Sequence, residues 1–324
     1  MSSELITVII ITYKHGELLY ETLDSVFMQD YDSIQLIVAE DGAENFTYSD
    51  VEEYIREHAS PNIKEYIILR AEKNRGTVKN INNAIDYAKG YYIRIIAGDD
   101  AFDNEQVFSK QIASLREYKD ALFVVGNIRE CDSEMNPGEL NGFAPNEVEK
   151  LLDGNKTKLL NYVIKKNPAL MATQATCYRA SFFEVVGKFD ECCLLIEDLP
   201  MIVRIYRRAV PFIYLDWVCV KHRGSVGVSA SGNAFEARQL MYYRDLLRCY
   251  DNVFFFVKKE LGKVYFFMRR GLIAFRIDYT KLRQSGAGFA KKSLLIVKNI
   301  LPIAYYCFTQ FHRFIFYFSQ KGKG

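Results

Sequence analysis

Short apolar runs alternate with amphipathic stretches along the first half of the chain. The apolar runs cover residues 5–12, 34–39, 65–69, 91–97 and 121–128. They are rich in Ile and Val with little polar alternation, which is typical of strands buried on both faces of a sheet. The stretches with apolar residues at helical spacing cover 16–28, 50–58, 77–89 and 104–118. The alternation predicts an α/β fold, Rossmann-like, with a mostly parallel sheet and helices on both faces.

The second half begins with a polar stretch. Residues 131–146 are rich in Gly, Pro and Asn, and we expect a loop there. Helices are then expected at 148–165 and 199–208, and strands at 172–179 and 211–220. Strand patterns stop after about residue 229, and the rest predicts helices at 238–259, 264–282 and 289–318. We therefore expect an α/β domain over residues 1–230 and a C-terminal helical region over 231–324.

Charge separates the two regions more sharply than hydropathy does. Residues 238–324 contain 17 Lys and Arg against 4 Asp and Glu, a net charge of +13. Subtraction from the totals of 42 and 40 leaves 25 and 36 upstream, a net charge of −11. The total of +2 gives no reason to expect a nucleic-acid partner. The asymmetry suggests that the two regions do different jobs.

The basic region also carries many aromatic residues. Its longest uncharged stretch, residues 299–311, has 13 residues, whereas a membrane span needs about 20. Aromatic and basic residues together are typical of a membrane interface, where anionic lipid attracts Lys and Arg. The alternative is a helical region that packs on the α/β domain or on a second subunit, which would make a homo-oligomer.

The seven cysteines include no C-x-x-C pair, so neither a zinc site nor a disulfide framework is expected. Reduced thiols are typical of the cytoplasm. The chain runs from Met1 straight into an apolar strand pattern, and we expect no secretory signal.

Two adjacent carboxylates, Asp99 and Asp100, follow Gly98 at the end of the strand predicted at 91–97. In open α/β sheets ligands bind outside the carboxyl ends of the strands. Two neighbouring carboxylates repel each other unless a cation lies between them, and oxygen ligands suit a hard divalent ion. The alternative is a solvated turn whose Asp caps the next helix.

Two further polar segments are expected at the same edge of the sheet. Glu40 and Asp41 follow the second strand and could accept hydrogen bonds from a base or a ribose, or could simply cap a turn at Gly42. Residues 74–80 lead into a helix and contain Lys79, which suits an anionic group such as a phosphate. Neither the P-loop nor the G-x-G-x-x-G spacing is present.

Two later segments could complete a site. Glu197 and Asp198 open a helix, where a carboxylate is either a cap or a general base. His222 follows the last strand and could join a metal shell or hold a phosphate. The chain has only four His, so zinc hydrolase chemistry is not expected.

Taken in order, these segments resemble the family 2 glycosyltransferases, which have the GT-A fold. The resemblance covers roughly the first 230 residues, in the segments 8–13, 37–42, 74–80, 95–100, 187–191 with 197–198, and 221–229. They are similar to the family's opening strand, its strand ending in two acids, its Asn-x-Gly-x-x-x-Asn element, its D-x-D region, its Gly-x-Phe-Asp-Glu and Glu-Asp elements, and its closing His and Ser segment. The chain departs from the family pattern at Thr12, Glu40, Ala43 and Ala97. Ala97 takes the place of the first acid of D-x-D, so the resemblance leaves Asp99 and Asp100 to bind the metal ion.

The resemblance implies an inverting, metal-dependent transfer of a sugar from a nucleotide-sugar donor, UDP-sugar by default. The acceptor would be a hydroxyl of a glycan or lipid-linked glycan in bacterial surface polysaccharide synthesis, at the inner face of the cell membrane. The donor-binding residues implied are Thr12, Tyr13, Glu40, Asp41, Lys79, Asp99 and Asp100. Mn²⁺ or Mg²⁺ would be held by Asp99, Asp100 and His222, and Asp198 beside Glu197 would deprotonate the acceptor.

Two other functions stay open at this point. A nucleotidyltransferase shares the strand-end acids but leaves Asp198 and His222 without a role. A non-catalytic nucleotide-sugar-binding scaffold has only Ala97 in its favour.

Overall fold

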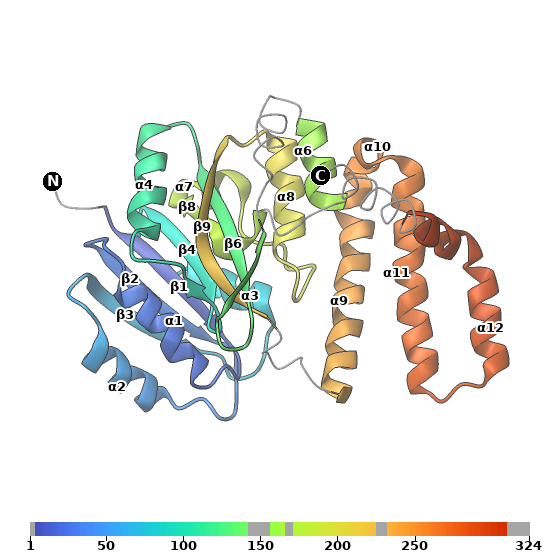
Figure 1. The fold of residues 1–324 in the computed structure, drawn as a ribbon, viewed down its shortest axis with the longest axis horizontal. Coiled ribbons are helices and arrows are strands. Elements are labelled where there is room, and N and C mark those ends of the chain that lie inside the picture. Colours follow the sequence, from blue (N-terminus) through green and yellow to red (C-terminus); the bar gives the residue numbers. More distant parts are fainter. Residues whose placement is uncertain (1–3, 142–155, 166–170, 225–231, 310–324) are drawn as a thin grey trace, which may run out of the picture. The chain divides into compact units, whose positions relative to one another are not determined.

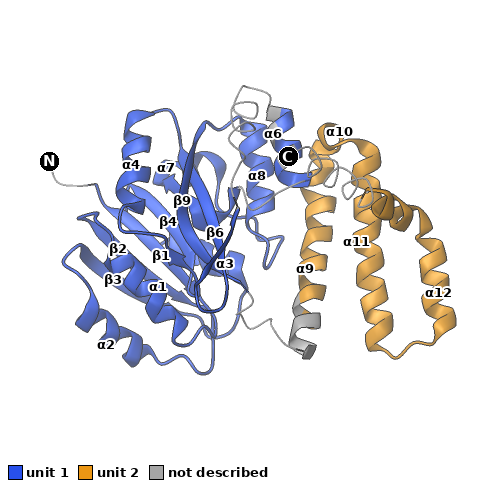
Figure 2. Ribbon diagram, in the orientation of Figure 1, with its two compact units in different colours: residues 1–235 blue, residues 236–324 orange. Residues whose placement is uncertain are grey.

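A computed structural model describes residues 4–141, 156–165, 171–224 and 232–309 (Figure 1). The chain falls into two compact units, residues 1–235 and 236–324 (Figure 2). The first unit is built on a sheet, and the second is helical throughout its described part.

Nine strands of the described residues form one sheet in the first unit. They are β1 (Ile6–Thr12), β2 (Ile34–Glu40), β3 (Ile63–Arg70), β4 (Tyr92–Ala97), β5 (Ala101–Phe102), β6 (Phe123–Cys131), β7 (Pro137–Asn141), β8 (Thr176–Arg179) and β9 (Phe212–Arg223). The order is β3-β2-β1-β4-β8-β6-β9-β5, with β7 paired to β6. The pairs from β3 to β4 and the β6–β9 pair are parallel, whereas β8, β5 and β7 run antiparallel to their neighbours.

Helices cover both faces of this sheet, as the sequence predicts. They are α1 (Leu18–Phe27), α2 (Tyr48–His58), α3 (Thr77–Ile85), α4 (Val107–Glu117), α6 (Lys156–Lys165), α7 (Ala180–Val186) and α8 (Asp198–Arg208). Helices α1, α2 and α4 share one apolar core with alternate residues of β1 and β2, among them Val8, Ile10 and Val38. Helix α3 packs on β1 and β2 outside that core. A right-handed crossover from β3 back to β4 places α3 on the opposite face.

The expected loop at 131–146 proves in part to be a hairpin. Residues 137–141 form β7, which pairs with β6, while 142–146 lie outside the described residues. The carboxylate of Asp132 organises the turn, because its Oδ1 accepts the amide N–H groups of Glu134 and Asn136, each at 2.9 Å. The predicted helix at 148–165 is described only from residue 156, as α6.

The predicted strand ends also shift. The strand predicted at 172–179 opens with a 3-10 turn, Thr173–Ala175, before β8. The strand predicted at 211–220 runs on to Arg223 as β9. This extension carries the last residues of β9 alongside β5, directly after the Asp99–Asp100 turn.

The second unit consists of helices α9 (Gly232–Asn252), α10 (Lys258–Leu261), α11 (Lys263–Gln284) and α12 (Phe289–Lys298), with a 3-10 turn at Phe254–Val257. Residues 300–309 are also helical, after a break at Asn299. The expected helix at 238–259 is therefore interrupted at the run of three Phe residues, whose first member, Phe254, is buried. The described part of the chain contains no helix that is both long and apolar enough to cross a membrane.

Tight packing at Gly126 in β6 gives a direct test of this sheet. A Cβ on Gly126 would lie 2.2 Å from Sγ of Cys219 and 2.9 Å from the carbonyl oxygen of Trp217 in β9. We expect Gly126→Ala to lower the unfolding free energy by about 1–3 kcal/mol, because overpacking a filled site forces its neighbours apart. Gly288→Ala is the control, since a Cβ there meets nothing within 4 Å. Equal melting temperatures for the two variants would contradict the packing described.

Candidate functional site

Three polar turns meet at one edge of the sheet because β2, β1 and β4 are parallel neighbours. The register aligns Thr12 with Glu40 and Ile11 with Ala97. The residues that follow these strands, among them Tyr13, Asp41 and Asp99, therefore start from the same edge. This is the arrangement that the sequence predicts.

The turn after β4 is packed closely against the turn after β1. The amide of Gly98 donates to the carbonyl of Ile11 at 2.8 Å. A Cβ on Gly98 would lie 2.9 Å from Nδ1 of His15 and 3.1 Å from Cβ of Thr12, so glycine permits this approach. His15 in turn places Nε2 3.7 Å from Oδ2 of Asp99.

Each of the two aspartates is flanked by a histidine. Nδ1 of His222 lies 2.9 Å from Oδ1 of Asp100, a carboxylate that is almost fully buried. This hydrogen bond raises the pKa of His222 to about 9. Burial raises the pKa of Asp99, and the charge of His15 opposes that rise.

Asp100 has an unused acceptor oxygen in this turn. Its Oδ2 is buried and has no hydrogen-bond partner among the described residues. An orphaned carboxylate oxygen next to the carboxylate of Asp99 fits a hard divalent cation such as Mg²⁺ or Mn²⁺. No group of three or more His, Cys, Asp and Glu side chains within the described ranges is placed to hold a metal ion. A cation here would therefore need ligands from a bound substrate or from water.

Glu40 and Asp41 are engaged with backbone amides. Buried Glu40 accepts the amide N–H of Gly42 at 3.0 Å and also that of Ala43. Asp41 accepts the amides of Arg75 at 2.9 Å and Gly76 at 2.8 Å. Burial raises the pKa of Asp41, and these hydrogen bonds counteract the rise. The two acids thus shape the turn after β2 and fix the segment before α3.

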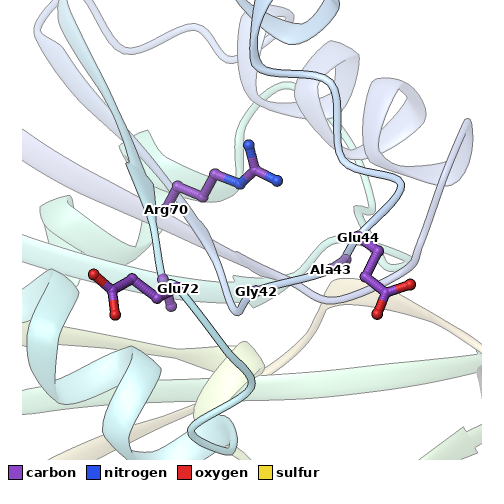
Figure 3. A pocket seen from close by; sticks show the side chains of 6 residues that line it. Gly42, Ala43, Glu44, Arg70 and Glu72 are labelled. Atoms are coloured by element: carbon purple, nitrogen blue, oxygen red, sulfur yellow. The ribbon is translucent and has the colours of Figure 1, made fainter.

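A pocket of about 360 Å³ opens at the ends of β2 and β3 (Figure 3). It is lined by Gly42, Ala43, Glu44, Arg70, Ala71 and Glu72. Arg70 projects its guanidinium from the end of β3, and Nε lies 3.9 Å from Oε2 of Glu40. The only feature of the sequence that marks Arg70 as a site residue is its position at the end of a predicted strand.

Helix α3 connects this edge to the later acidic segment. The amide of Val78 donates to the carbonyl of Leu194 at 3.3 Å. The Asn82 side chain donates to the carbonyl of Phe189 at 2.9 Å and accepts its amide at 3.0 Å. Lys79, predicted to meet a phosphate, is exposed on α3. The segment that leads to Glu197 is therefore anchored beside the Asp41 turn.

Glu197 and Asp198 stand at the start of α8. Oδ1 of Asp198 accepts the amide N–H of Leu199 at 2.7 Å. Burial raises the pKa of Asp198 to about 6. Burial and the adjacent charge of Asp198 raise the pKa of Glu197 to about 8. A carboxylate whose pKa is raised toward neutral suits a general base.

Comparison with known proteins decides the family. Residues 7–186, 180 of the 324, match the sequence model of glycosyl transferase family 2. The chain belongs to glycosyl transferase family 2. The prediction of a glycosyltransferase, made from the order of its motifs, is confirmed at this level.

Two named glycosyltransferases are similar to parts of this chain at low identity. Glycosyltransferase GlyG of Streptococcus pneumoniae is 28% identical over 130 residues, 40% of this chain and 41% of GlyG. The processive diacylglycerol beta-glycosyltransferase of Mycoplasma genitalium is 21% identical over 259 residues, 78% of this chain and 71% of the relative. The chain thus spans about two fifths of GlyG and a larger share of the Mycoplasma enzyme.

Solved structures of similar fold confirm the GT-A architecture. Mannosyltransferase PcManGT from Pyrobaculum calidifontis, in complex with GDP-Man and Mn²⁺, has a TM-score of 0.56 at 16% identity and covers 91% of this chain and 79% of its own. S. aureus TarS 1-349 in complex with UDP-GlcNAc has a TM-score of 0.55 at 16% identity, over 93% and 91%. A longer TarS structure is covered over 43% of its length.

In this family 2 glycosyltransferase, sequence reasoning missed three basic residues that contact the predicted acids. His15 flanks Asp99, Arg75 lies 3.8 Å from Oδ1 of Asp41, and Arg223 contacts the Asp99–Asp100 turn. Arg75 and Arg223 lie inside predicted motifs, and His15 follows the first. Their position next to motif residues is the feature of the sequence that could have identified them as site residues.

Proposed function

We propose that the chain is an inverting, metal-dependent glycosyltransferase that uses a UDP-sugar donor. The observation that carries the proposal is that the first unit holds two acidic turns of different character, one after β4 and one at the start of α8. One turn, Asp99–Asp100, holds a buried oxygen without a hydrogen-bond partner among the described residues. The other holds Asp198, whose pKa is raised toward neutral. A cation-binding group and a base are the two functions that this reaction requires.

The donor is proposed to lie along the ends of β1, β2 and β4. Thr12, Tyr13 and Asp41 would contact its base and ribose, with Glu40 holding the turn that carries Asp41. The pocket next to Arg70 gives the nucleoside end further room. Lys79, exposed on α3, would approach the diphosphate. TarS binds UDP-GlcNAc in a similar fold, which supports UDP as the nucleotide.

Asp99, Asp100 and His222 are the residues proposed for the Mn²⁺ or Mg²⁺ site. The two carboxylates would hold the cation, and His222 contacts the carboxylate of Asp100. The bound cation would stabilise the negative charge that grows on the diphosphate as it leaves. PcManGT was solved with Mn²⁺ and GDP-Man, which supports a divalent ion in this fold.

Asp198 is proposed as the base of the transfer. Its carboxylate accepts the proton of the acceptor hydroxyl, whose oxygen attacks the anomeric carbon from the face opposite the diphosphate. The new C–O bond forms as the bond to the diphosphate breaks, and the diphosphate departs with the electron pair. A single displacement inverts the anomeric centre. Burial and the adjacent charge of Asp198 raise the pKa of Glu197, which stands beside the proposed base.

The acceptor is proposed to be a lipid-linked glycan of a bacterial surface polysaccharide, reached at the cytoplasmic face of the membrane. A relative of this chain is named for a diacylglycerol substrate. No residue of α12 is buried, and the exposed side chains there and in 300–309 include Phe289 at 86%, Val297 at 64% and Leu301 at 67%. Five Lys and Arg but no Asp or Glu lie at residues 279–309. Such a surface is complementary to anionic lipid.

Asp99→Asn tests the cation site. The wild type should gain several degrees in melting temperature from its UDP-sugar only when Mn²⁺ is present, because ligand binding stabilises the folded state. Asp99→Asn removes a charged ligand, and this gain should disappear. Asp120→Asn, an exposed carboxylate on the same unit, is the control and should behave as the wild type. An undiminished Mn²⁺-dependent gain in Asp99→Asn would overturn the assignment.

Asp198→Asn tests the base. Transfer should fall by at least about 10²-fold, the usual contribution of a general base, while donor binding persists. An acid whose pKa is higher in the folded chain destabilises the fold once ionised, so this variant should also melt at a higher temperature at neutral pH. Wild-type kcat/KM should decline as pH falls below about 6, where Asp198 takes up a proton. Turnover retained by Asp198→Asn would refute the role.

Vesicle flotation tests the membrane surface. The wild type should float with phosphatidylglycerol vesicles but not with phosphatidylcholine vesicles, and added salt should release it. Phe289→Ser, Val297→Ser and Leu301→Ser combined should abolish flotation. Met28→Ser with Tyr118→Ser, also exposed but in the first unit, is the control. If the wild type does not float but forms a homo-oligomer that the triple change dissociates, the exposed surface binds a second copy of the chain and not lipid.

A further inference from the structure

Arg223, the last residue of β9, joins three parts of the first unit. Its amide donates to Oδ1 of Asp100 and its Nε to the carbonyl of Asp99, both at 3.0 Å. Its Nη1 donates to the carbonyl of Ser133 at 2.6 Å, and its Nη2 pairs with Glu21. One side chain therefore links the turn after β4, the turn between β6 and β7, and helix α1.

Because Arg223 is buried, its N–H groups depend on these contacts for their hydrogen bonds. The residue is 5% exposed, whereas the side chain of its ionic partner Glu21 is 56% exposed. A buried guanidinium needs its N–H groups satisfied, and its planar fork sets the directions of the acceptors. A lysine carries the same charge but cannot donate in three fixed directions.

We propose that Arg223 is a positioning residue for the cation site. Its amide, which lysine would also supply, holds the carboxylate of Asp100, whereas its guanidinium Nε holds the backbone of Asp99. The side chain therefore fixes the turn and, through it, the spacing of the two carboxylates. By holding Ser133 as well, it makes that spacing depend on the order of the β6–β7 turn. The proposal rests on the proposed function, since it assigns Asp99 and Asp100 to the cation.

Arg179 offers a matched control. It is also a buried arginine, 7% exposed, and it donates Nε to the carbonyl of Ala121 at 2.9 Å and Nη2 to the carbonyl of Leu115. These acceptors belong to the segment around α4 rather than to the acidic turns. An arginine-to-lysine change should therefore cost stability at both positions but should affect the cation only at Arg223.

The experiment compares Arg223→Lys and Arg179→Lys in the full chain. Both variants should melt below the wild type. Only Arg223→Lys should raise the Mn²⁺ concentration needed for half-maximal UDP-sugar binding, by about 10–100-fold as for other residues that orient metal ligands. An unchanged Mn²⁺ requirement in a folded Arg223→Lys would overturn the proposal, as would an equal increase in Arg179→Lys.

Glu21→Gln covers the case in which Arg223→Lys does not fold. It weakens one contact of Arg223 at an exposed position, so the Mn²⁺ requirement should rise with little loss in melting temperature. A Mn²⁺ requirement equal to that of the wild type in Glu21→Gln would then overturn the proposal.

Hydrogen exchange of the protein without ligand tests the role of Arg223 separately from the proposed function. A wild type that binds no nucleotide sugar with Mn²⁺ would refute the proposed function. Faster exchange at 98–102 and at 131–136 in Glu21→Gln or Arg223→Lys, but not in Arg179→Lys, would still support the coupling of the two turns. Unchanged exchange at both turns would refute the coupling itself.

Discussion

The parallel pairing of β2, β1 and β4 is the constraint on which the rest of the site depends. Strands that run in the same direction end at the same edge, so the chain must place three successive turns there. The register that sets Thr12 against Glu40 and Ile11 against Ala97 keeps those turns level. Acids separated by up to about sixty residues in sequence are brought to one edge by backbone hydrogen bonds alone.

The acids at this edge have two kinds of partner. The difference separates carboxylates that hold a turn in place from carboxylates that can bind a ligand. Glu40 and Asp41 accept backbone amides from their own turn and from the segment before α3. Asp99 and Asp100 each face an imidazole, and Asp100 also accepts the amide of Arg223, but its other oxygen is left without a partner in the described structure. Carboxylates that hold a loop are already satisfied, whereas this pair retains the capacity to bind a ligand.

The sequence predicts most strands and helices of the first unit and its acidic turns, because Ile- and Val-rich runs report burial directly. It misses the two-residue strand β5 and helix α7. It does not predict β7, since residues 137–141 are polar and their strand conformation comes from pairing with β6. It also misses Arg223, whose partners lie 90 to 202 residues away in sequence. Contacts of this range follow from the tertiary fold and leave no local pattern. The roles of the site residues stay proposals.

The orphaned oxygen of Asp100 has a consequence for the life of the protein in the cell. A buried polar atom without a partner makes the empty protein less stable than its fold could be, and a ligand that occupies it restores that stability. Molecules without donor would then open more often and be degraded sooner by proteases.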